Sequence, residues 1–288
     1  MISIDALSEI IAYLNRREFT AAGRSDDSHP LFAQGDHVNA HYANFNLSTL
    51  LQPIVDIASG ASVAHEAFLQ ARTPAGVTAL GHALTAENLF ANSCNSGCIT
   101  YLDRLTRTLH ALNFLRQDIG GDLHLNVHPH HMLAVSADHG RVFEAILQQC
   151  GLAPRNIVLE VQEHGIRDRL QLARAIAAWQ SRGYRIAIDN FDREHIQIER
   201  VLRLRPDLIK FDISLLHERA LTHGTHALRF MAETVRAAGI RIVATGIETL
   251  RQEQIATAIG AQFGQGHWFG RPAETAQPIT SDGEKRLA

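Results

Sequence analysis

The residues of this sequence with the clearest chemical potential are acids and amides that follow short apolar runs. Glu66 lies within such a run, and Asn126, Glu160 and Asp189 stand at the ends of three others. Carboxylate and amide oxygens are the ligands that Mg²⁺ and Mn²⁺ prefer in proteins. Lys210 ends a further run, where its ammonium group could orient a water molecule or contact a phosphate. Brought together, these groups suit metal-assisted chemistry on a phosphate ester.

A simpler explanation competes with this hypothesis at each position taken alone. A single acid in an apolar strand can be there only to make a local hydrogen bond. A lone buried carboxylate is costly, however, and four oxygen ligands delivered by four runs favour one shared site.

The apolar runs alternate with amphipathic segments, and this alternation predicts a parallel α/β sheet. The run 186–188 is apolar on both faces, as in buried parallel strands, and leads into Asp189 and Asn190. Runs 50–57 and 62–69 are separated by only a few residues, which predicts an antiparallel hairpin. The other strands are expected at 123–127, 157–161, 186–189, 208–211, 240–244 and 262–266, and the helices between them at 99–115, 141–149, 167–181, 195–204, 225–238 and 250–259.

Eight such strands over roughly 230 residues predict a modified TIM-type (β/α)8 barrel with an antiparallel first strand. A doubly wound open sheet is the alternative, but the sequence lacks a G-x-G-x-x-G turn. The barrel domain is expected to span 48–276 and to be followed by a flexible tail, 277–288. Residues 1–47 are expected to contain a helix at 3–15 and a linker at 20–46 rich in Gly, Ser, Asp, His and Asn. The apolar face of that helix packs on the barrel or contacts a partner.

Composition indicates an ordinary globular protein of 288 residues, with 45% hydrophobic residues and a net charge of −3. This charge predicts no general attraction to nucleic acid or to an anionic membrane. No apolar run is long enough to span a bilayer, and the acidic start is unlike a signal peptide. The three Cys lack metal-ligand spacing and indicate reduced thiols. A cytoplasmic location without membrane insertion is therefore expected.

Nine ordered motifs resemble those of the EAL domain, the bacterial cyclic di-GMP phosphodiesterase domain. Glu66-Ala67-Phe68-Leu69 is similar to the signature that names the family, and Ile188-Asp189-Asn190-Phe191 to its D-D-F-G motif. The other similar segments are Gln52-Pro53-Ile54-Val55-Asp56, Leu102-Asp103, Leu125-Asn126-Val127, Glu160-Val161-Gln162-Glu163, Ile209-Lys210-Phe211-Asp212, Ala244-Thr245-Gly246-Ile247-Glu248-Thr249 and Gln265-Gly266. The resemblance covers about 48–275. It implies a TIM-like barrel that binds cyclic di-GMP, which active members hydrolyse to pGpG with two Mg²⁺ or Mn²⁺ ions.

The resemblance also implies roles for individual residues. Glu66 and Lys210 correspond to catalytic positions, and Glu163 to the residue that anchors a loop beside the site. Substrate-binding positions are implied for Gln52, Gln265 and Arg72. The ligands implied for the first metal ion are Glu66, Asn126, Glu160 and Asp189.

Four departures from the family pattern fall on the chemistry. Asn190 stands where active members carry a second Asp, and Thr245 replaces the first Glu of A-E-G-V-E, so the second metal site is expected to be lost. Gln70 replaces an Arg that contacts phosphate, and Arg72 lies on the same strand face and could compensate. The Gly-rich loop after D-D-F has become Asp192-Arg193-Glu194-His195. Three histidines near the rim, His128, His130 and His131, are either hydrated loop residues or a transition-metal site.

Three functions stay open at this point. The first is a degenerate, non-catalytic EAL-type module that binds cyclic di-GMP or a protein partner as a receptor or regulator. The second is an active or weakly active cyclic di-GMP phosphodiesterase that retains one Mg²⁺ or Mn²⁺ site. The third is a protein-interaction module that no longer binds nucleotide, and a homodimer is compatible with each of them.

Overall fold

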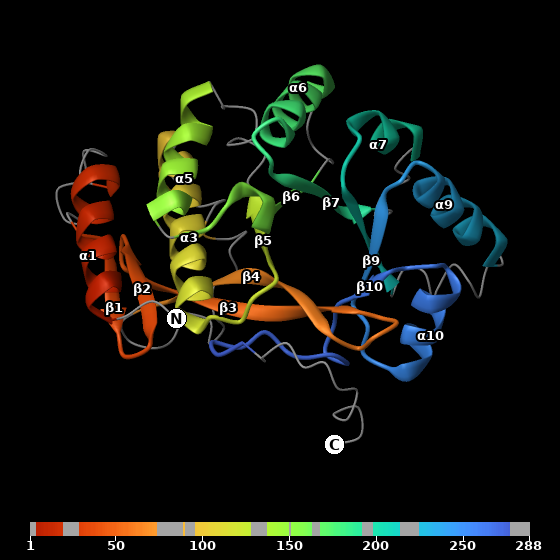
Figure 1. Cartoon of the computed structure of the whole chain (residues 1–288), viewed down its shortest axis with the longest axis horizontal. Coiled ribbons are helices and arrows are strands. Elements are labelled where there is room, and N and C mark those ends of the chain that lie inside the picture. Colours follow the sequence, from red (N-terminus) through yellow and green to blue (C-terminus); the bar gives the residue numbers. More distant parts are fainter. Residues whose placement is uncertain are drawn as a thin grey trace.

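A computed structural model describes residues 4–19, 29–73, 89, 96–127, 137–149, 151–162, 168–191, 198–213 and 225–276. Its main feature is a closed barrel of eight strands within a larger ten-stranded sheet (Figure 1). The barrel strands are β3 Phe45–Asp56, β4 Ser62–Arg72, β5 Asp122–Val127, β6 Ile157–Gln162, β7 Arg185–Phe191, β8 Leu208–Asp212, β9 Arg241–Thr245 and β10 Phe263–Gly264. Strand β3 is antiparallel to both of its barrel neighbours, and the other pairs are parallel. The predicted barrel with an antiparallel first strand is confirmed.

Helices cover the outside of the arc of parallel strands (Figure 1). They are α3 Ser96–Gln117, α5 Ala137–Gln149, α6 Arg169–Gln180, α7 Ile198–Leu204, α9 Thr225–Ala237 and α10 Leu250–Ala258, with a short 3-10 turn, η2, at Pro154–Asn156. The sequence defines some of their ends by capping. The Thr249 hydroxyl accepts a hydrogen bond from the backbone N–H of Gln252, and the Gln252 side-chain oxygen accepts one from the backbone N–H of Thr249. This capping box starts α10.

The main apolar core lies between the strands and these helices. It is built from the outward-facing residues of the strands, such as Leu159, Ile186 and Ile209, together with Trp179 and Ile176 of α6. Residues on one face of a strand recur every second position, so the alternate residues point into the barrel. This separation leaves the barrel interior for a different set of side chains.

The N-terminal region differs from the prediction. Residues 29–46, part of the expected linker, contain strands β1 Leu31–Gln34 and β2 His37–Tyr42, and β3 already begins at Phe45. Strands β1 and β2 form a hairpin, and β2 pairs with the first residues of β3. The linker prediction is therefore wrong for these residues. Their alternating buried positions stabilise the strands through partners far away in the sequence, which composition does not reveal.

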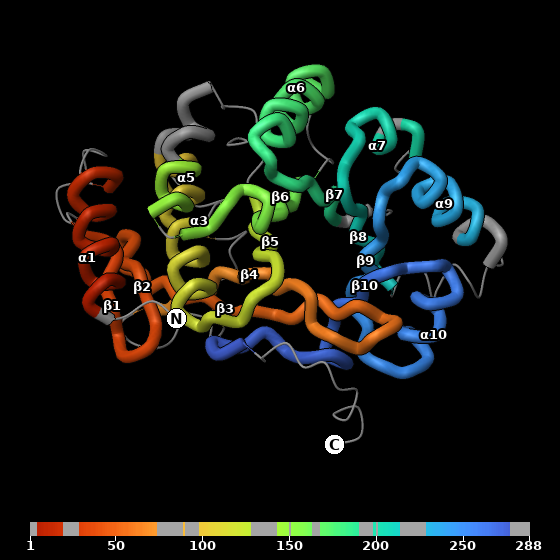
Figure 2. Tube along the Cα trace, in the orientation of Figure 1, coloured from red at the N-terminus to blue at the C-terminus, as the bar shows by residue number. Residues whose placement is uncertain are grey.

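A second apolar core attaches this hairpin and the predicted N-terminal helix, α1 Ile4–Leu14, to the barrel. Leu7, Ile11 and Leu14 pack there with Leu31 and Val38 of the hairpin. The rest of this core comes from α3 and its neighbours, including Leu102, Leu105, Leu109 and Leu112. A π-helical segment, η1 Asn15–Phe19, follows α1, and the Asn15 amide donates to the Leu31 carbonyl and accepts from its N–H at 2.8 and 3.0 Å. The helix thus packs on the domain itself, and Figure 2 shows α1 beside β1 and β2.

Candidate functional site

The barrel interior is layered, with apolar residues below and polar residues above. Ala64, Val158, Ala187, Leu208 and Val243 form a small buried cluster with Ile54. Two residues further along the same strands stand Glu66, Glu160, Asp189, Lys210 and Thr245. Period-two alternation places each polar residue on the same face as its apolar predecessor, at the carboxyl end of a parallel strand. The predicted rim residues are therefore brought to one end of the barrel.

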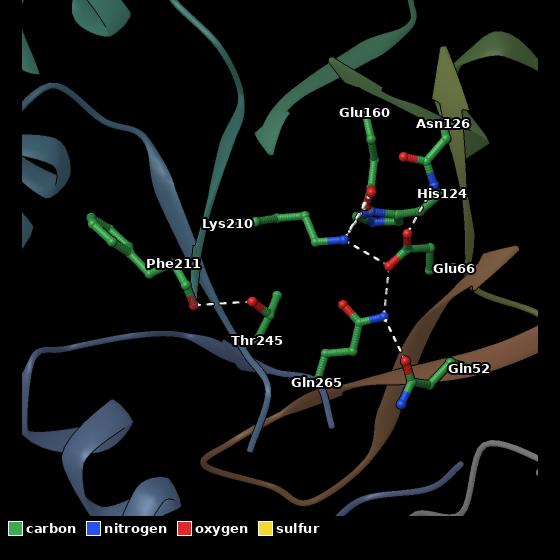
Figure 3. Close-up of polar contacts among 9 residues, drawn as sticks. All are labelled: Gln52, Glu66, His124, Asn126, Glu160, Lys210, Phe211, Thr245 and Gln265. Atoms are coloured by element: carbon green, nitrogen blue, oxygen red, sulfur yellow. Dashed lines mark hydrogen bonds and ion pairs between the residues drawn. The ribbon is translucent and has the colours of Figure 1, made fainter. Parts of the chain in front are cut away.

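Lys210 lies at the centre of this polar layer (Figure 3). Its Nζ donates to Glu66 Oε2 at 2.7 Å and to the two Glu160 oxygens at 2.9 and 2.8 Å. All three side chains are buried, with at most 6% of any one exposed. One ammonium group therefore bridges two carboxyl groups that water cannot screen.

Amide side chains complete the surroundings of Glu66. Asn126 donates to its Oε1 at 2.9 Å, and Gln265 donates to its Oε2 at 2.7 Å. Gln265 also contacts the Gln52 oxygen at 3.2 Å, and Gln52 in turn donates to the Gly270 carbonyl at 2.9 Å. Gln52 and Gln265 thus support Glu66 from the side of β3 and the chain after β10.

The two acids experience opposite electrostatic effects. Burial alone would raise the pKa of Glu66, but the charge of Lys210 and the hydrogen bonds from Lys210, Gln265 and Asn126 lower it to about 2. Burial and the negative charge of Glu66 raise the pKa of Glu160 well above its ordinary value, although Lys210 opposes the shift. Burial would lower the pKa of Lys210, but Glu160, Glu66 and Asp189 raise it instead. Glu66 is therefore the firmly ionised partner of a permanently charged Lys210.

His124 is a member of this network that our sequence analysis missed. Its Nδ1 lies 2.8 Å from Glu160 Oε1 and 2% of the side chain is exposed. Burial, assisted by the positive charge of Lys210, lowers the pKa of His124 to about 3. A neutral imidazole donates this hydrogen bond when its proton is on Nδ1, with Glu160 as the acceptor. The signal was present in the sequence, because His124 precedes Asn126 by two residues and so shares its strand face.

A cavity of about 270 Å³ opens above the network. Glu66, Asp189, Lys210, Gln52 and Gln265 line it, which joins two of the predicted substrate-binding residues to two of the four predicted metal ligands. Asn126 and Glu160 are not among its lining residues. Residues that the sequence analysis gave no role also line it, namely Phe68, Gly246, Glu248, Gly266 and His267.

Thr245 lines the same cavity with a neutral side chain. Its hydroxyl donates to the Phe211 carbonyl at 3.2 Å, so it serves the backbone of the neighbouring strand β8 (Figure 3). Its register partner on that strand is Asp212. The position at which the family pattern has a Glu thus contributes a hydroxyl that is already engaged.

The donor types suit a hard divalent cation, although the described residues hold no cluster of three or more His, Cys, Asp or Glu side chains placed to bind one. A carboxylate offers about four acceptor positions, and three are used on each acid. On Glu66, Lys210 and Gln265 donate to Oε2 and Asn126 donates to Oε1. On Glu160, Lys210 and His124 bond to Oε1 and Lys210 also donates to Oε2. Each acid keeps one position, on Glu66 Oε1 and on Glu160 Oε2. The Asn126 amide oxygen and the Asp189 carboxylate add the type of ligand that Mg²⁺ and Mn²⁺ take.

Other predicted positions are placed elsewhere or are not described. Arg72 does not line this cavity and instead lines a second one, and Gln70 accepts a hydrogen bond from Ser48 at 3.3 Å. The backbone of Asn190 continues β7, but its side chain lies outside the described residues. Also outside them lie Glu163, the histidines His128, His130 and His131, the loop 192–195 and the tail 277–288.

No helix within the described ranges has the length and hydropathy needed to cross a membrane. This finding agrees with the absence of a long apolar run in the sequence.

Known proteins with the same family pattern come from several bacteria. YkuI of Bacillus subtilis, an uncharacterized EAL-domain protein, is 31% identical over 48% of the chain and 35% of its own length. The probable cyclic di-GMP phosphodiesterase PdeB of Escherichia coli is 25% identical over 79% of the chain and 43% of its own length. The chain therefore spans less than half of these two relatives.

Solved structures show the same fold. A standalone EAL protein of Vibrio cholerae, bound to c-di-GMP, superposes with a TM-score of 0.70 at 17% identity, covering 83% of this chain and 98% of its own. YkuI in complex with c-di-GMP and calcium gives a TM-score of 0.69 at 23% identity, covering 81% and 57%. The model of the EAL domain family matches residues 38–272, most of the sequence and all of the barrel up to the segment after β10. The chain belongs to the EAL domain family.

Proposed function

We propose that this EAL domain binds cyclic di-GMP at the barrel mouth and acts as a receptor or regulator without effective hydrolysis. The observation that carries the proposal is Thr245, a neutral residue whose hydroxyl is bonded to the Phe211 carbonyl within the cavity lined by Glu66 and Lys210. Asn190, the amide in place of an acid, supports the same conclusion from its sequence position. Both positions have lost the carboxylate expected beside a second metal ion.

The residues that remain suit binding more than bond cleavage. A divalent cation held by Glu66, Asn126, Glu160 and Asp189 would supply Lewis-acid stabilisation of a phosphate oxygen. Lys210 keeps the two buried acids compensated, and Gln52 and Gln265 hold Glu66 in place. With fewer acids, these groups neutralise and orient a phosphodiester but provide little to activate water.

A weakly active phosphodiesterase is the second candidate, and the intact Glu66–Lys210–Glu160 network favours it. Turnover of cyclic di-GMP by the full chain, with Mg²⁺ and with Mn²⁺, separates the two candidates when run beside a binding titration. We expect binding with no steady formation of pGpG. Turnover that the Glu66→Gln variant abolishes contradicts the proposal.

A gain-of-function variant tests the cause. The double substitution Asn190→Asp with Thr245→Glu restores both carboxylates and is expected to raise turnover at least tenfold. This increase corresponds to a decrease of about 1.4 kcal/mol in the activation free energy. The matched control Asn190→Asp with Thr245→Gln supplies the same volume with one charge fewer. Equal turnover by the two variants would show that charge at position 245 is not what limits catalysis.

A further inference from the structure

A second cavity lies between the N-terminal hairpin and the barrel. Its volume is about 400 Å³, larger than the 270 Å³ of the barrel mouth. It is bounded by β1 and β2, by the first residues of β3, by the end of β4 at Arg72 and by Glu274 after β10. This volume is within the range of small-molecule sites.

The floor of this cavity is fixed by buried hydrogen bonds. Asn113 of α3 accepts from the N–H of Val38 at 2.9 Å and donates to its carbonyl at 2.8 Å. Thr49 is hydrogen-bonded to Nδ1 of His110 at 2.8 Å. The floor therefore ties the hairpin to α3 and β3 and holds the shape of the cavity without a ligand.

The rim of the cavity is different, because several of its polar side chains are unused, whereas Gln34 and Asn39 bond to each other. Among the described residues, the side chains of Arg72, His37, Asn46 and Glu274 form no hydrogen bond or ion pair, although all four line the cavity. They bring a guanidinium fork, an imidazole, an amide and a carboxylate to one concave surface. Such a set of convergent polar groups around a formed cavity is typical of a ligand site.

The second cavity and the barrel mouth lie at different positions along the β3–β4 hairpin. Arg72 lies six residues beyond Glu66 on β4, and Asn46 pairs with Arg72 just as Gln52 pairs with Glu66. At about 3.3 Å per residue, these two pairs are separated by roughly 20 Å along the hairpin. Among the described residues, none lines both cavities.

We propose that this cavity binds a small polar molecule with a single phosphate or carboxylate group, held by Arg72. The guanidinium fork matches the oxygens of either anion. His37 and Asn46 add hydrogen-bonding groups. The negative charge of Glu274 disfavours a second anionic group on the ligand, and its carboxylate can accept a hydrogen bond from a ligand hydroxyl. The site stands independently of the function of the barrel mouth.

The probes are glycerol 3-phosphate, which carries a phosphate and hydroxyl groups, and lactate, which carries a carboxylate and a hydroxyl group. Glycerol is the neutral control. Titration of the full chain by heteronuclear NMR is expected to give saturable shifts at Val38, Asn46 and Thr73 with one of the anions and none with glycerol. Response to glycerol 3-phosphate alone identifies a phosphate site, and response to lactate alone identifies a carboxylate site. Saturable shifts with neither anion overturn the proposal.

Two variants and a matched control make the test specific. Arg72→Gln is expected to weaken binding of the responding anion at least about tenfold, and Asn46→Leu, which removes the amide from the rim, to weaken it as well. Arg251→Gln removes the same charge from the exposed face of α10 and is expected to bind as the wild type does. Equal weakening by Arg72→Gln and Arg251→Gln indicates general electrostatics and overturns the site. Loss of cyclic di-GMP binding in Arg72→Gln would assign Arg72 to the nucleotide instead and overturn it as well.

Discussion

The two cavities of this domain use polar residues in opposite ways. At the barrel mouth, Lys210, Glu66 and Glu160 are buried and bonded to one another, so their charges are balanced within the protein. In the second cavity, Arg72 and Glu274 are exposed and unused. Buried charges without partners are expensive, whereas exposed ones are hydrated at little cost. The charged residues of the barrel mouth therefore also stabilise the fold, whereas the exposed charged residues of the second cavity can be replaced at little cost in stability.

The largest expected effect is the loss of Lys210. Lys210→Met leaves two buried acids without their cation, and removing one partner of a buried ion pair typically costs about 3–5 kcal/mol of unfolding free energy. Urea unfolding followed by circular dichroism measures it. A loss below about 1 kcal/mol would mean that protonation or water compensates the two acids without Lys210. The two cavities would then not differ in how strongly their charged residues contribute to stability.

Substitution of His124 tests whether buried residues next to the proposed metal ligands hold them in place. His124→Leu removes a buried donor to Glu160, and we expect a loss of about 1–3 kcal/mol in stability. Mn²⁺ affinity should fall about 10–100-fold, because residues that orient metal ligands have effects of this size. His124→Gln keeps a donor group and should recover part of the affinity. Mn²⁺ titration by electron paramagnetic resonance checks this, and unchanged affinity in His124→Leu would contradict a supporting role.

His110, beneath the second cavity, predicts a pH effect. Burial lowers the pKa of His110 to about 3, whereas the unfolded chain takes up the proton near pH 6.5. The unfolded state therefore binds more protons below pH 6.5, and the stability contribution present above that pH is lost as the pH falls toward 3. The expected loss is about 1.4 kcal/mol per pH unit.

The test compares wild type with His110→Gln, since other groups, including Glu160, titrate with the opposite sign. Between pH 7 and 6 the unfolding free energy of the variant should fall by about 0.7 kcal/mol less than that of the wild type, and between pH 6 and 5 by about 1.2 kcal/mol less. Parallel pH profiles would show that His110 is protonated in the folded protein.

The smallest expected effect belongs to Arg72. Arg72→Gln should change the unfolding free energy by no more than about 0.5 kcal/mol, as is usual for exposed side chains without partners. Thermal and urea unfolding of this variant beside Lys210→Met give the comparison directly. A loss of several kcal/mol would mean that Arg72 supports the hairpin and is not available to a ligand.

Sequence patterns predicted the barrel and most of its mouth for a clear physical reason. Apolar runs marked the strands, and the residues that end three of them, Asn126, Glu160 and Lys210, were correctly placed beside Glu66, which lies within its own run. His124 also lies within a run and was missed because an imidazole is not one of the oxygen ligands that marked the rim.

The N-terminal region was harder to predict because its structure depends on distant partners. Strand β2 contains His and Asn, Gly35 stands in the turn before it, and the buried residues of the hairpin pack with distant residues of α1, α3 and β3. Strand alternation correctly placed Arg72 on the face of Gln70, but the length by which β3 and β4 extend beyond the barrel mouth is a property of the whole sheet. Arg72 therefore lines a cavity that no local pattern indicated.

Strand β3 also has a consequence for how the chain reaches its fold. The barrel closes when Val55 and Asp56 pair with β10, and roughly 200 residues separate the two partners. During synthesis, the edge of β3 that later receives β10 must wait for the last strand to emerge. An unpaired edge invites pairing with other chains. The β1–β2 hairpin is translated before β3 and pairs with the start of that edge at Phe45, Asn46 and Leu47. It therefore shortens the part of the β3 edge that is exposed to other chains.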